Sequence, residues 1–394
     1  MPLFTLEAVR AKHGDSLILH YGPENQPRFI LIDGGPPGVY QDFLRPRLKE
    51  IRGHWYEDKA LPLEMVMVSH IDADHIDGIL DLTDELIENE NDRLCDIGVL
   101  WHNSFDEVVG NREQDLVSKL PKGLVKAASL DDIPGEFEKG DRFAAAIAAS
   151  VTQGRKLRRN AERLGLPVND PFAGLVSSDI MIQGKKTTAR FNWGDGLTLT
   201  VLGPGRDRIL ELHKKWEAEL IKKGPLAAIA AGYEDTSPYN LSSIVVLAES
   251  GGKKMLLTGD ARGDYILTAL EEAGLLEKDG EDALKVDLLK MPHHGSHHNV
   301  EDGFFQRIIA DHYVISGDGG YGNPEEEALK MIVDSRQDDG FTVWMTYREG
   351  REDLKKKLDK FLAARKKQKR KFGVEFCPDG QNSMKIDLLG KVDY

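Results

Sequence analysis

The sequence His70-Ile71-Asp72-Ala73-Asp74-His75 places four side chains that can bind a metal within six residues. It follows the apolar run 64–68, which predicts a buried strand, and it precedes residues 76–89, whose apolar spacing predicts a helix. Neither a strand nor a helix alone directs four such side chains to one point, so we expect a tight loop. Imidazole nitrogens and carboxylate oxygens together suit Zn²⁺ or Mn²⁺. The stretch therefore predicts a metal site at the end of a strand.

Three other predicted strands also end at residues that can bind a metal. Asp33 follows the apolar run 28–32, Asp260 follows 254–258, and His293 follows 286–291. Helical patterns at 40–52, 265–273 and 303–310 alternate with these strands, and a further strand is expected at 313–316. Alternating strands and helices predict an α/β fold, in which sites are built at strand ends. We expect these residues to meet at one edge of the fold.

The composition is that of an ordinary globular protein. The chain has 394 residues, 52 Lys plus Arg, 66 Asp plus Glu, and a formal net charge of −14. This composition argues against disorder and against a disulfide scaffold. The sequence lacks an apolar run long enough for a membrane span and an apolar stretch typical of a secretory signal. Two cysteines, Cys95 and Cys377, suit a reducing compartment, so we expect a cytoplasmic protein without membrane contact.

The sequence predicts a single domain, 1–394, with two insertions and a C-terminal segment of different charge. Residues 106–185 show helical patterns without a chemical motif and are interpreted as a helical insertion, and 206–238 as a second insertion or linker. Residues 341–394, predicted to contain strands and a basic helix, hold 14 Lys plus Arg against 8 Asp plus Glu. That is a net +6, which leaves −14 − 6 = −20 for the remainder. Global charge therefore argues against general coating of nucleic acid.

Several motifs together resemble one protein superfamily. The sequence His-x-Asp-x-Asp-His at 70–75 is similar to the His-x-His-x-Asp-His signature of the metallo-β-lactamase superfamily, with Asp72 in place of the second histidine. That variant resembles the nuclease-like domain of bacterial DNA-uptake competence proteins (ComEC-like). Further matching segments are His13-Gly14-Asp15-Ser16, 30–35, 240–246, 256–260, 288–296, 315–317 and 321–324. The resemblance implies an αββα sandwich that holds one or two divalent metal ions, Zn or Mn, between two facing sheets.

The resemblance also implies roles for individual residues. His70 and Asp72 would hold the first metal, and Asp74, His75 and His293 the second, with Asp260 as a bridge between the two. His294 is the alternative to His293 as a ligand, and His293 is favoured because it lies nearer the strand end. Asp33 would orient a ligand histidine through its other ring nitrogen. His294 or Asn323 would contact the scissile phosphate or protonate the leaving oxygen, Asp74 would share in catalysis, and Ser296 would bind substrate.

The sequence departs from the resembled branch at two positions. Asp77 stands where glycine is usual, and Asn323 stands where histidine is usual. A third ligand of the first metal has no clear counterpart, and His102 and Asn240 are the candidates.

Phosphodiester cleavage by a metal-bound hydroxide is the function that these features favour. Ten Lys or Arg fall between 355 and 371, which predicts a basic helix that tracks a phosphate backbone. The substrate-binding residues expected there are Lys366, Lys367, Lys369, Arg370 and Lys371. Two alternatives stay open. One is a hydrolase of a small phosphodiester, lactone or thioester, and the other is a non-catalytic or partner-activated subunit with a degraded metal site. A protein partner or a second copy of the chain is a further expectation.

Overall fold

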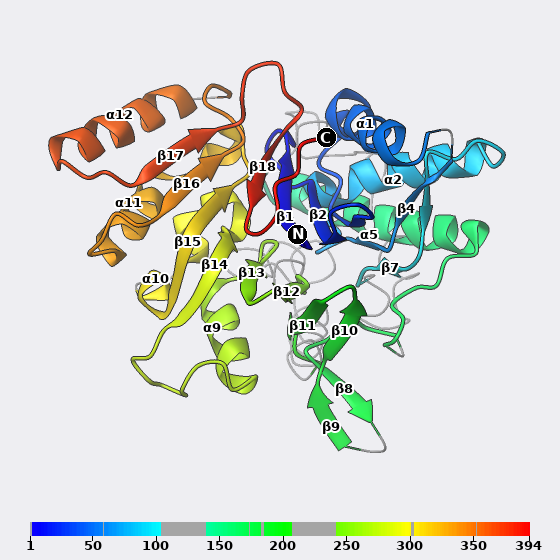
Figure 1. The fold of residues 1–394 in the computed structure, drawn as a ribbon, viewed down its shortest axis with the longest axis horizontal. Coiled ribbons are helices and arrows are strands. Elements are labelled where there is room, and N and C mark those ends of the chain that lie inside the picture. The colour runs from blue at the N-terminus through cyan, green and yellow to red at the C-terminus, as the bar shows by residue number, and fades with distance from the viewer. Residues whose placement is uncertain are drawn as a thin grey trace.

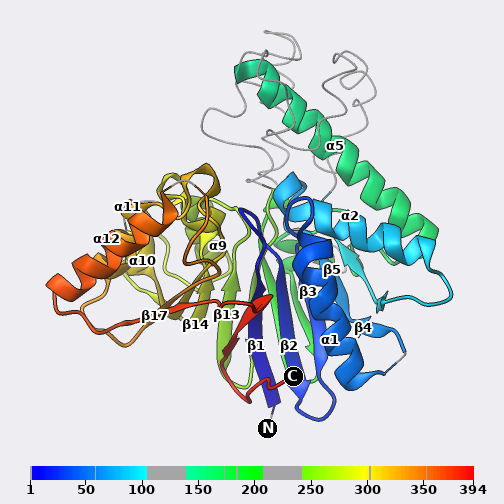
Figure 2. The ribbon, with the colours of Figure 1, turned by 90° about the horizontal axis from the view of Figure 1, so that it is seen from above.

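Two β-sheets face each other and helices cover their outer faces (Figures 1 and 2). The computed structural model describes residues 2–57, 59–103, 139–172, 174–182, 185–206, 242–300, 303–351 and 353–394. The first sheet has the strand order β18-β1-β2-β3-β5-β7. Its strands are β1 (Pro2–Val9), β2 (Leu17–Pro23), β3 (Arg28–Ile32), β5 (Met65–Met67), β7 (Leu100–Trp101) and β18 (Ser383–Asp387). The last strand of the chain thus pairs with the first.

The second sheet has eight strands in the order β10 to β17. They are β10 (Arg190–Gly194), β11 (Leu197–Gly203), β12 (Val245–Ser250), β13 (Lys253–Leu257), β14 (Leu284–Lys290), β15 (Ile308–Ile315), β16 (Thr342–Met345) and β17 (Gly373–Phe376). Strands β13 to β17 run parallel to one another. In the first sheet β3, β5 and β7 are also parallel. The loops that follow parallel strands lie at one edge of a sheet, which is where α/β folds place their sites.

Helices form the outer layers of the sandwich. On the first sheet lie the π-helix η1 (Tyr40–Leu44), α1 (Arg45–Trp55) and α2 (Ala73–Glu88), with α5 (Lys139–Leu164) outside α2 (Figure 2). On the second sheet lie α9 (Gly263–Glu272), α10 (Phe304–Arg307), α11 (Glu326–Ser335) and α12 (Leu354–Lys367). Among the described residues, none of the helices combines the length and the apolar character that a membrane crossing requires.

Three apolar clusters separate the four layers. The central cluster lies between the sheets and joins residues such as Leu19 and Ile30 of the first sheet to Val201 and Val246 of the second. A second cluster packs the other face of the first sheet against α1 and α2, and a third packs the second sheet against α9 to α12. Strands buried on both faces need near-continuous apolar runs, such as Phe29-Ile30-Leu31-Ile32 in β3. The predicted αββα sandwich is confirmed.

One predicted helix is shorter than expected, and the helices predicted at 40–52, 76–89 and 265–273 are confirmed within a few residues. The helix expected at 303–310 is a single turn, α10, because Ile308 already begins β15. Ile308 and Ala310 pair with Leu284 and Val286 of the neighbouring strand, so ladder hydrogen bonds replace the helical ones. Apolar runs of this length do not distinguish a helix from a strand.

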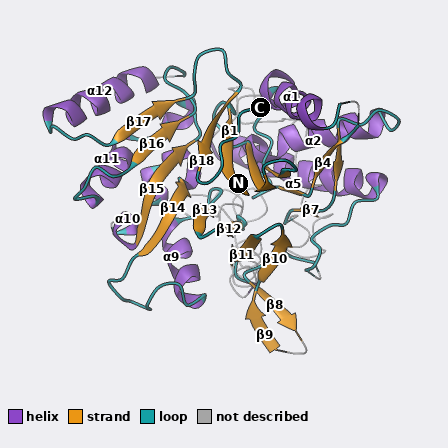
Figure 3. Ribbon diagram, in the orientation of Figure 1, coloured by secondary structure: helices purple, strands orange, loops and turns teal. Residues whose placement is uncertain are grey.

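The first predicted insertion is partly described. It contains α5 and the ribbon of β8 (Asp179–Ile182) and β9 (Lys185–Thr188), which stands away from the main sheets (Figure 3). Residues 104–138 and 207–241, the latter holding nearly all of the second predicted insertion, lie outside the described residues. A further two-stranded sheet pairs β4 (Leu61–Leu63) with β6 (Cys95–Ile97).

A close contact between two glycines brings the end of β3 against α2. A Cβ added at Gly34 would lie 2.4 Å from the backbone nitrogen of Ile79, and one added at Gly78 would lie 2.0 Å from the carbonyl oxygen of Gly34. No side chain larger than hydrogen fits at either position without a shift of backbone. This approach sets the distance between Asp33 and the first turn of α2.

Candidate metal centre

The loop between β5 and α2 turns the 70–75 motif toward the gap between the sheets. Asp72 is extended (φ −69°, ψ 146°) and caps α2, and its carbonyl oxygen accepts hydrogen bonds from the backbone N–H groups of His75 and Ile76. Asp74 and His75 therefore lie in the first helical turn, whereas His70 and Asp72 precede it. The positive end of the helix dipole also favours carboxylates at this position.

Asp33 holds this loop from behind. It is fully buried and has a left-handed backbone (φ 58°), so its carboxylate reaches across to the neighbouring strand end. Its Oδ2 accepts hydrogen bonds from His75 Nδ1 at 2.9 Å and from Ser69 Oγ at 2.7 Å, and its Oδ1 accepts from the Ser69 backbone N–H at 2.7 Å. With its Nδ1 proton directed to Asp33, His75 turns its Nε2 toward the centre. Asp33 thus lies where the resemblance implies an orienting carboxylate, and that role stays a prediction.

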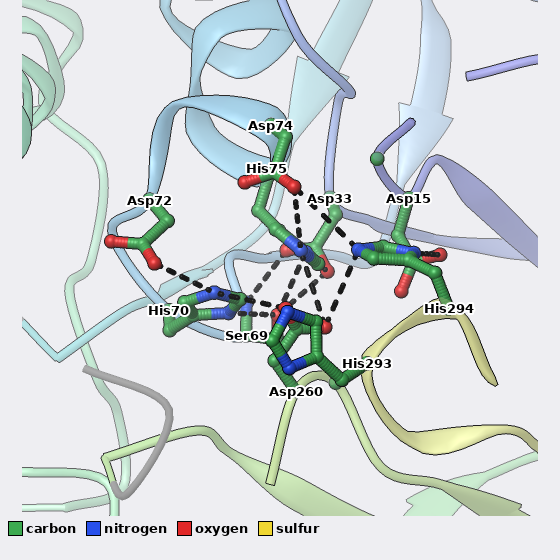
Figure 4. A network of polar contacts seen from close by, with 12 residues as sticks. Asp15, Asp33, Ser69, His70, Asp72, Asp74, His75, Asp260, His293 and His294 are labelled. Atoms are coloured by element: carbon green, nitrogen blue, oxygen red, sulfur yellow. Dashed lines mark hydrogen bonds and ion pairs between the residues drawn. The ribbon is translucent and has the colours of Figure 1, made fainter. Parts of the chain in front are cut away.

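Asp260 lies in the middle of the cluster (Figure 4). It follows β13 and is 2 % exposed. Its Oδ1 is 3.4 Å from His75 Nε2 and 3.6 Å from His294 Nε2. Its Oδ2 is 3.7 Å from His70 Nε2 and 3.5 Å from His293 Nε2. The two oxygens of one carboxylate thus face two separate pairs of histidines, which is how a bridging ligand is placed.

The structure assigns the two adjacent histidines differently from the sequence prediction. His294, not His293, lies beside the second predicted group, with Nε2 3.5 Å from Asp74 Oδ2. His293 shares Asp260 Oδ2 with His70, and Asp72 lies on that side, 3.6 Å from His70. The reason is the backbone: both histidines are left-handed, with φ of 44° and 55°, so the turn sends successive rings to different sides.

Two residues that the sequence analysis did not place in the site support His294. Asp15, in the loop after β1, has Oδ1 3.4 Å from His294 Nδ1, and its Oδ2 lies 2.6 Å from Lys290 Nζ. Asp15 and Lys290 are both almost completely buried. Asp15 thus lies beside Nδ1 of His294 at an ion-pair distance, whereas Asp33 makes a hydrogen bond to Nδ1 of His75. A lysine inside the apolar strand 284–290 was the available signal, because a buried ammonium requires a carboxylate partner.

With carboxylates on both sides, His294 is placed as a ligand. Its two ring nitrogens face Asp15 on one side and Asp74 with Asp260 on the other. This geometry favours a ligating role for His294, and its proton-donating role stays a prediction.

The electrostatics of the cluster favour added positive charge. Burial lowers the pKa of the His75 imidazole, but Asp260, Asp33 and Asp74 outweigh burial and raise that pKa well above its ordinary value. Burial likewise lowers the pKa of His294, yet Asp260 and Asp15 raise it to about 9. Burial raises the pKa of Asp260, whereas His293, His294 and His75 hold it well below the ordinary range. Bound divalent cations would replace these imidazole protons.

Buried ring nitrogens that lack hydrogen-bond partners test whether a metal fits. Among the described residues, His70 Nε2, His75 Nε2, His294 Nε2 and Asp260 Oδ1 are buried without a hydrogen-bond partner. Buried polar groups are costly unless they are paired or bind a metal. All four atoms point into the same centre, so the residues present fit one or two divalent ions.

The remaining predicted site residues fall into three groups. Asn323 and Ser296 lie beside the His293 turn: Asn323 Nδ2 donates to the His293 carbonyl at 3.3 Å, and the Ser296 backbone N–H donates to the same oxygen at 2.9 Å. His102 is buried beyond β7, and burial, followed by the charge of Arg158 in α5, lowers the pKa of its imidazole to about 4. Its role as a third ligand stays a prediction, and Asn240 lies outside the described residues.

The basic segment 366–371 lies at the end of the second sheet's strands that is opposite the metal centre. The side chain of Arg370 binds Asp339 and the carbonyl oxygens of Arg336 and Asp338 in the loop that precedes β16, and the carbonyl oxygen of Val333 in α11. The metal centre instead lies after the C-terminal ends of the parallel strands, whereas Arg370 lies at their N-terminal ends. The eight residues of β15 span about 26 Å between these two ends. Figure 1 likewise shows the end of α12 that leads to β17 at the periphery. Lys366, Lys367, Lys369, Arg370 and Lys371 therefore do not line the metal centre, and Arg370 is held by structural contacts.

The four layers, with acidic and histidine-rich loops at one edge, agree with the fold that the resemblance to the metallo-β-lactamase superfamily implies. No protein-family model matches the chain. Over 132 residues the chain is 27% identical to ComE operon protein 3 of Bacillus subtilis, and this similarity covers 31% of the chain and 15% of that protein. The similarity confirms the resemblance to the competence-protein branch, and it spans only a small part of the relative's length.

Solved structures with a similar chain path include a diiron enzyme and a zinc-bound protein. CmlA, a diiron β-hydroxylase from Streptomyces venezuelae, is 12% identical with a TM-score of 0.39, over 98% of this chain and 55% of that one. Zn²⁺-bound PqqB from Methylobacterium extorquens is 11% identical with a TM-score of 0.37, over 95% of this chain and 87% of that one.

Proposed function

We propose that this chain is a metal-dependent hydrolase that cleaves phosphodiesters, with two divalent ions held by the centre. The observation that carries the proposal is Asp260, whose two carboxylate oxygens each face a separate pair of histidines. One ion would be held by Asp74, His75 and His294, the other by His70, Asp72 and His293, with Asp260 shared. This arrangement supports two ions and argues against a degraded site.

The chemistry of the donor set favours a phosphate ester as substrate. Carboxylates and imidazoles in this ratio suit Zn²⁺ or Mn²⁺. Two such metal ions, when bound, would polarise phosphoryl oxygens and lower the pKa of water at the site. The protein's own residues orient the ligands: Asp33 accepts a hydrogen bond from Nδ1 of His75, and Asp15 lies 3.4 Å from Nδ1 of His294. Asn323, on the carbonyl of His293, is the residue that we propose to contact the substrate.

Metal analysis and a substrate panel test the proposal. The purified chain is assayed with Mn²⁺ or Zn²⁺ on single-stranded DNA, double-stranded DNA, RNA and small phosphodiesters, lactones and thioesters. We expect metal-dependent cleavage of phosphodiesters, lost in Asp260→Asn and Asp74→Asn and kept in Asp287→Asn, a substitution on β14 outside the centre. Cleavage of lactones or thioesters alone would assign the alternative. Full activity of the metal-bound double variant Asp74→Asn/Asp260→Asn would refute the mechanism.

A protein partner or a second copy of the chain stays a prediction. Light scattering after size-exclusion chromatography would test it, and a monomer with full activity would contradict it.

A further inference from the structure

Two histidines and a glutamate form a second group of potential metal ligands outside the metal centre. His297 and His298 lie in the short 3-10 helix η5 (His297–Asn299), and Glu325 is the N-cap residue of α11. One potential ligand atom from each of these three residues lies within 4.8 Å of the other two. The histidines that face Asp260 in the centre are different ones, so we treat this group separately and call it the outer cluster.

The three side chains of the outer cluster already contact one another. Glu325 Oε2 accepts a hydrogen bond from the His297 backbone N–H at 3.2 Å and is paired with His297 Nδ1. The rings of His297 and His298 lie with their centroids 3.9 Å apart, at an angle of 40°. Successive side chains of a strand point to opposite faces, so it is the turn of η5 that brings two neighbouring imidazoles together.

The backbone holds the two segments of the outer cluster in place. The Gly295 carbonyl oxygen accepts a hydrogen bond from the Glu325 backbone N–H at 3.1 Å, and a Cβ added at Gly295 would lie 3.0 Å from Cβ of Pro324. The Val300 backbone N–H donates to the His297 carbonyl oxygen at 3.1 Å and closes the turn. Because the ligand atoms are brought together by these contacts, little ordering is required when an ion binds.

The chemistry and exposure of the outer cluster suit a transition-metal ion from solution. His298 is exposed, and the side chains of His297 and Glu325 are 36% and 22% exposed. Two imidazoles and one carboxylate bind Zn²⁺ with a fourth position for water. Ligand atoms at about 2.0–2.2 Å from a tetrahedral Zn²⁺ lie roughly 3.3–3.6 Å apart, which a rotation of the exposed His298 side chain allows. Mn²⁺ binds such a set more weakly than Zn²⁺.

We propose that the outer cluster binds one Zn²⁺ ion. An ion held there would tie η5 to the start of α11. His293, which lies in the metal centre, precedes η5 by four residues, and its Nδ1 is 2.8 Å from Oδ1 of Asn299 in η5. The outer ion would therefore stabilise the segment that positions His293.

The metal content of matched variants tests this proposal. The full chain is dialysed against a buffered concentration of free Zn²⁺, and bound zinc is measured for wild type, His298→Gln, Glu325→Gln and His54→Gln. His54 is an exposed histidine of α1 and controls for the loss of an imidazole elsewhere on the surface. Because each variant is compared with wild type, the ions in the centre cancel. The result is therefore independent of whether the chain cleaves phosphodiesters.

We expect wild type to bind one Zn²⁺ ion more than His298→Gln at the same free concentration. The affinity should fall by about 10- to 100-fold or more, since loss of a partner that only orients a ligand already has this effect. Glu325→Gln should weaken the same ion because its amide oxygen carries no charge, and His54→Gln should equal wild type. Equal zinc content in wild type and His298→Gln, or an equal deficit in His54→Gln, would overturn the inference.

Chemical modification of the wild-type chain locates the ion without any substitution. Diethyl pyrocarbonate acylates imidazole nitrogens, and mass spectrometry measures the modification of individual histidines with and without Zn²⁺. Bound Zn²⁺ should protect His297 and His298 and leave His54 unprotected. Modification of the two outer histidines at the same rate with and without Zn²⁺ would show that they only pair with Glu325, and would overturn the inference even where a variant fails to fold.

Discussion

Replacing Asp33 by asparagine should weaken metal binding without a change of shape. Asparagine is nearly isosteric with aspartate and tolerates the left-handed backbone at this position (φ 58°). Its side-chain oxygen can still accept from the Ser69 backbone N–H, as Oδ1 does at 2.7 Å. The amide nitrogen, however, would replace Oδ2, which now accepts from His75 Nδ1 at 2.9 Å and from Ser69 Oγ.

The consequence is a change of tautomer at His75. An amide N–H facing His75 Nδ1 requires that nitrogen to accept, so the ring proton moves to Nε2. Nε2 is the atom that faces Asp260 at 3.4 Å and that would bind the ion. Loss of such an orienting carboxylate typically lowers metal affinity about 10- to 100-fold, which corresponds to about 1.4–2.8 kcal/mol.

Competition titration of Mn²⁺ against a chelator measures the effect directly. Thermal unfolding with saturating and with chelated metal gives the same quantity by linkage, because only the folded chain forms the site. Asp287→Asn, a surface substitution on β14 that loses a contact with Lys253, is the matched control and should bind metal as wild type does. A folded Asp33→Asn variant with unchanged Mn²⁺ affinity would refute the tautomer argument.

Three further predictions concern pH, the buried ion pair and the basic segment. The pKa of His294 is raised to about 9 without metal, so protonation of His294 stabilises the metal-free fold fully below the ordinary pKa of 6.5. This stabilisation should be lost as the pH rises through about 9, and the affinity for Mn²⁺ should increase over the same range. Urea unfolding and metal titration at several pH values measure the two effects. Arg47→Met leaves the buried Glu7 carboxylate without its guanidinium partner and should lower the free energy of unfolding by about 3–5 kcal/mol with unchanged metal affinity, whereas a stable variant would contradict the pairing. Changing Lys366, Lys367 and Lys369 to Gln should leave cleavage of short substrates unchanged, because these residues lie at the far edge of the second sheet; a large fall in kcat would show that the segment reaches the centre.

The sequence by itself determined the layers and most of the donor set. Apolar runs such as 28–32 predict strands buried on both faces, and each ends at an Asp or His because strand ends are where polar groups can gather. The motif at 70–75 is contiguous, so its ligands and its loop could be read locally. A run such as 303–310 could not, because tertiary pairing with β14 decides between a helix and a strand.

Only the tertiary structure decided how these donors are grouped. The left-handed turn at His293 and His294 exchanges their expected partners, and no local pattern specifies which side each ring takes. Asp15 and Lys290 meet although 275 positions separate them in the chain, since they belong to different sheets. The charge of residues 366–371 predicted a contact with nucleic acid. The direction of β16 and β17, however, places this segment at the end of the strands that is opposite the metal centre. The sequence shows directly which ligand types are present and in which order they follow the strands. Which ligands from distant strand ends come together depends on how the two sheets pack against each other.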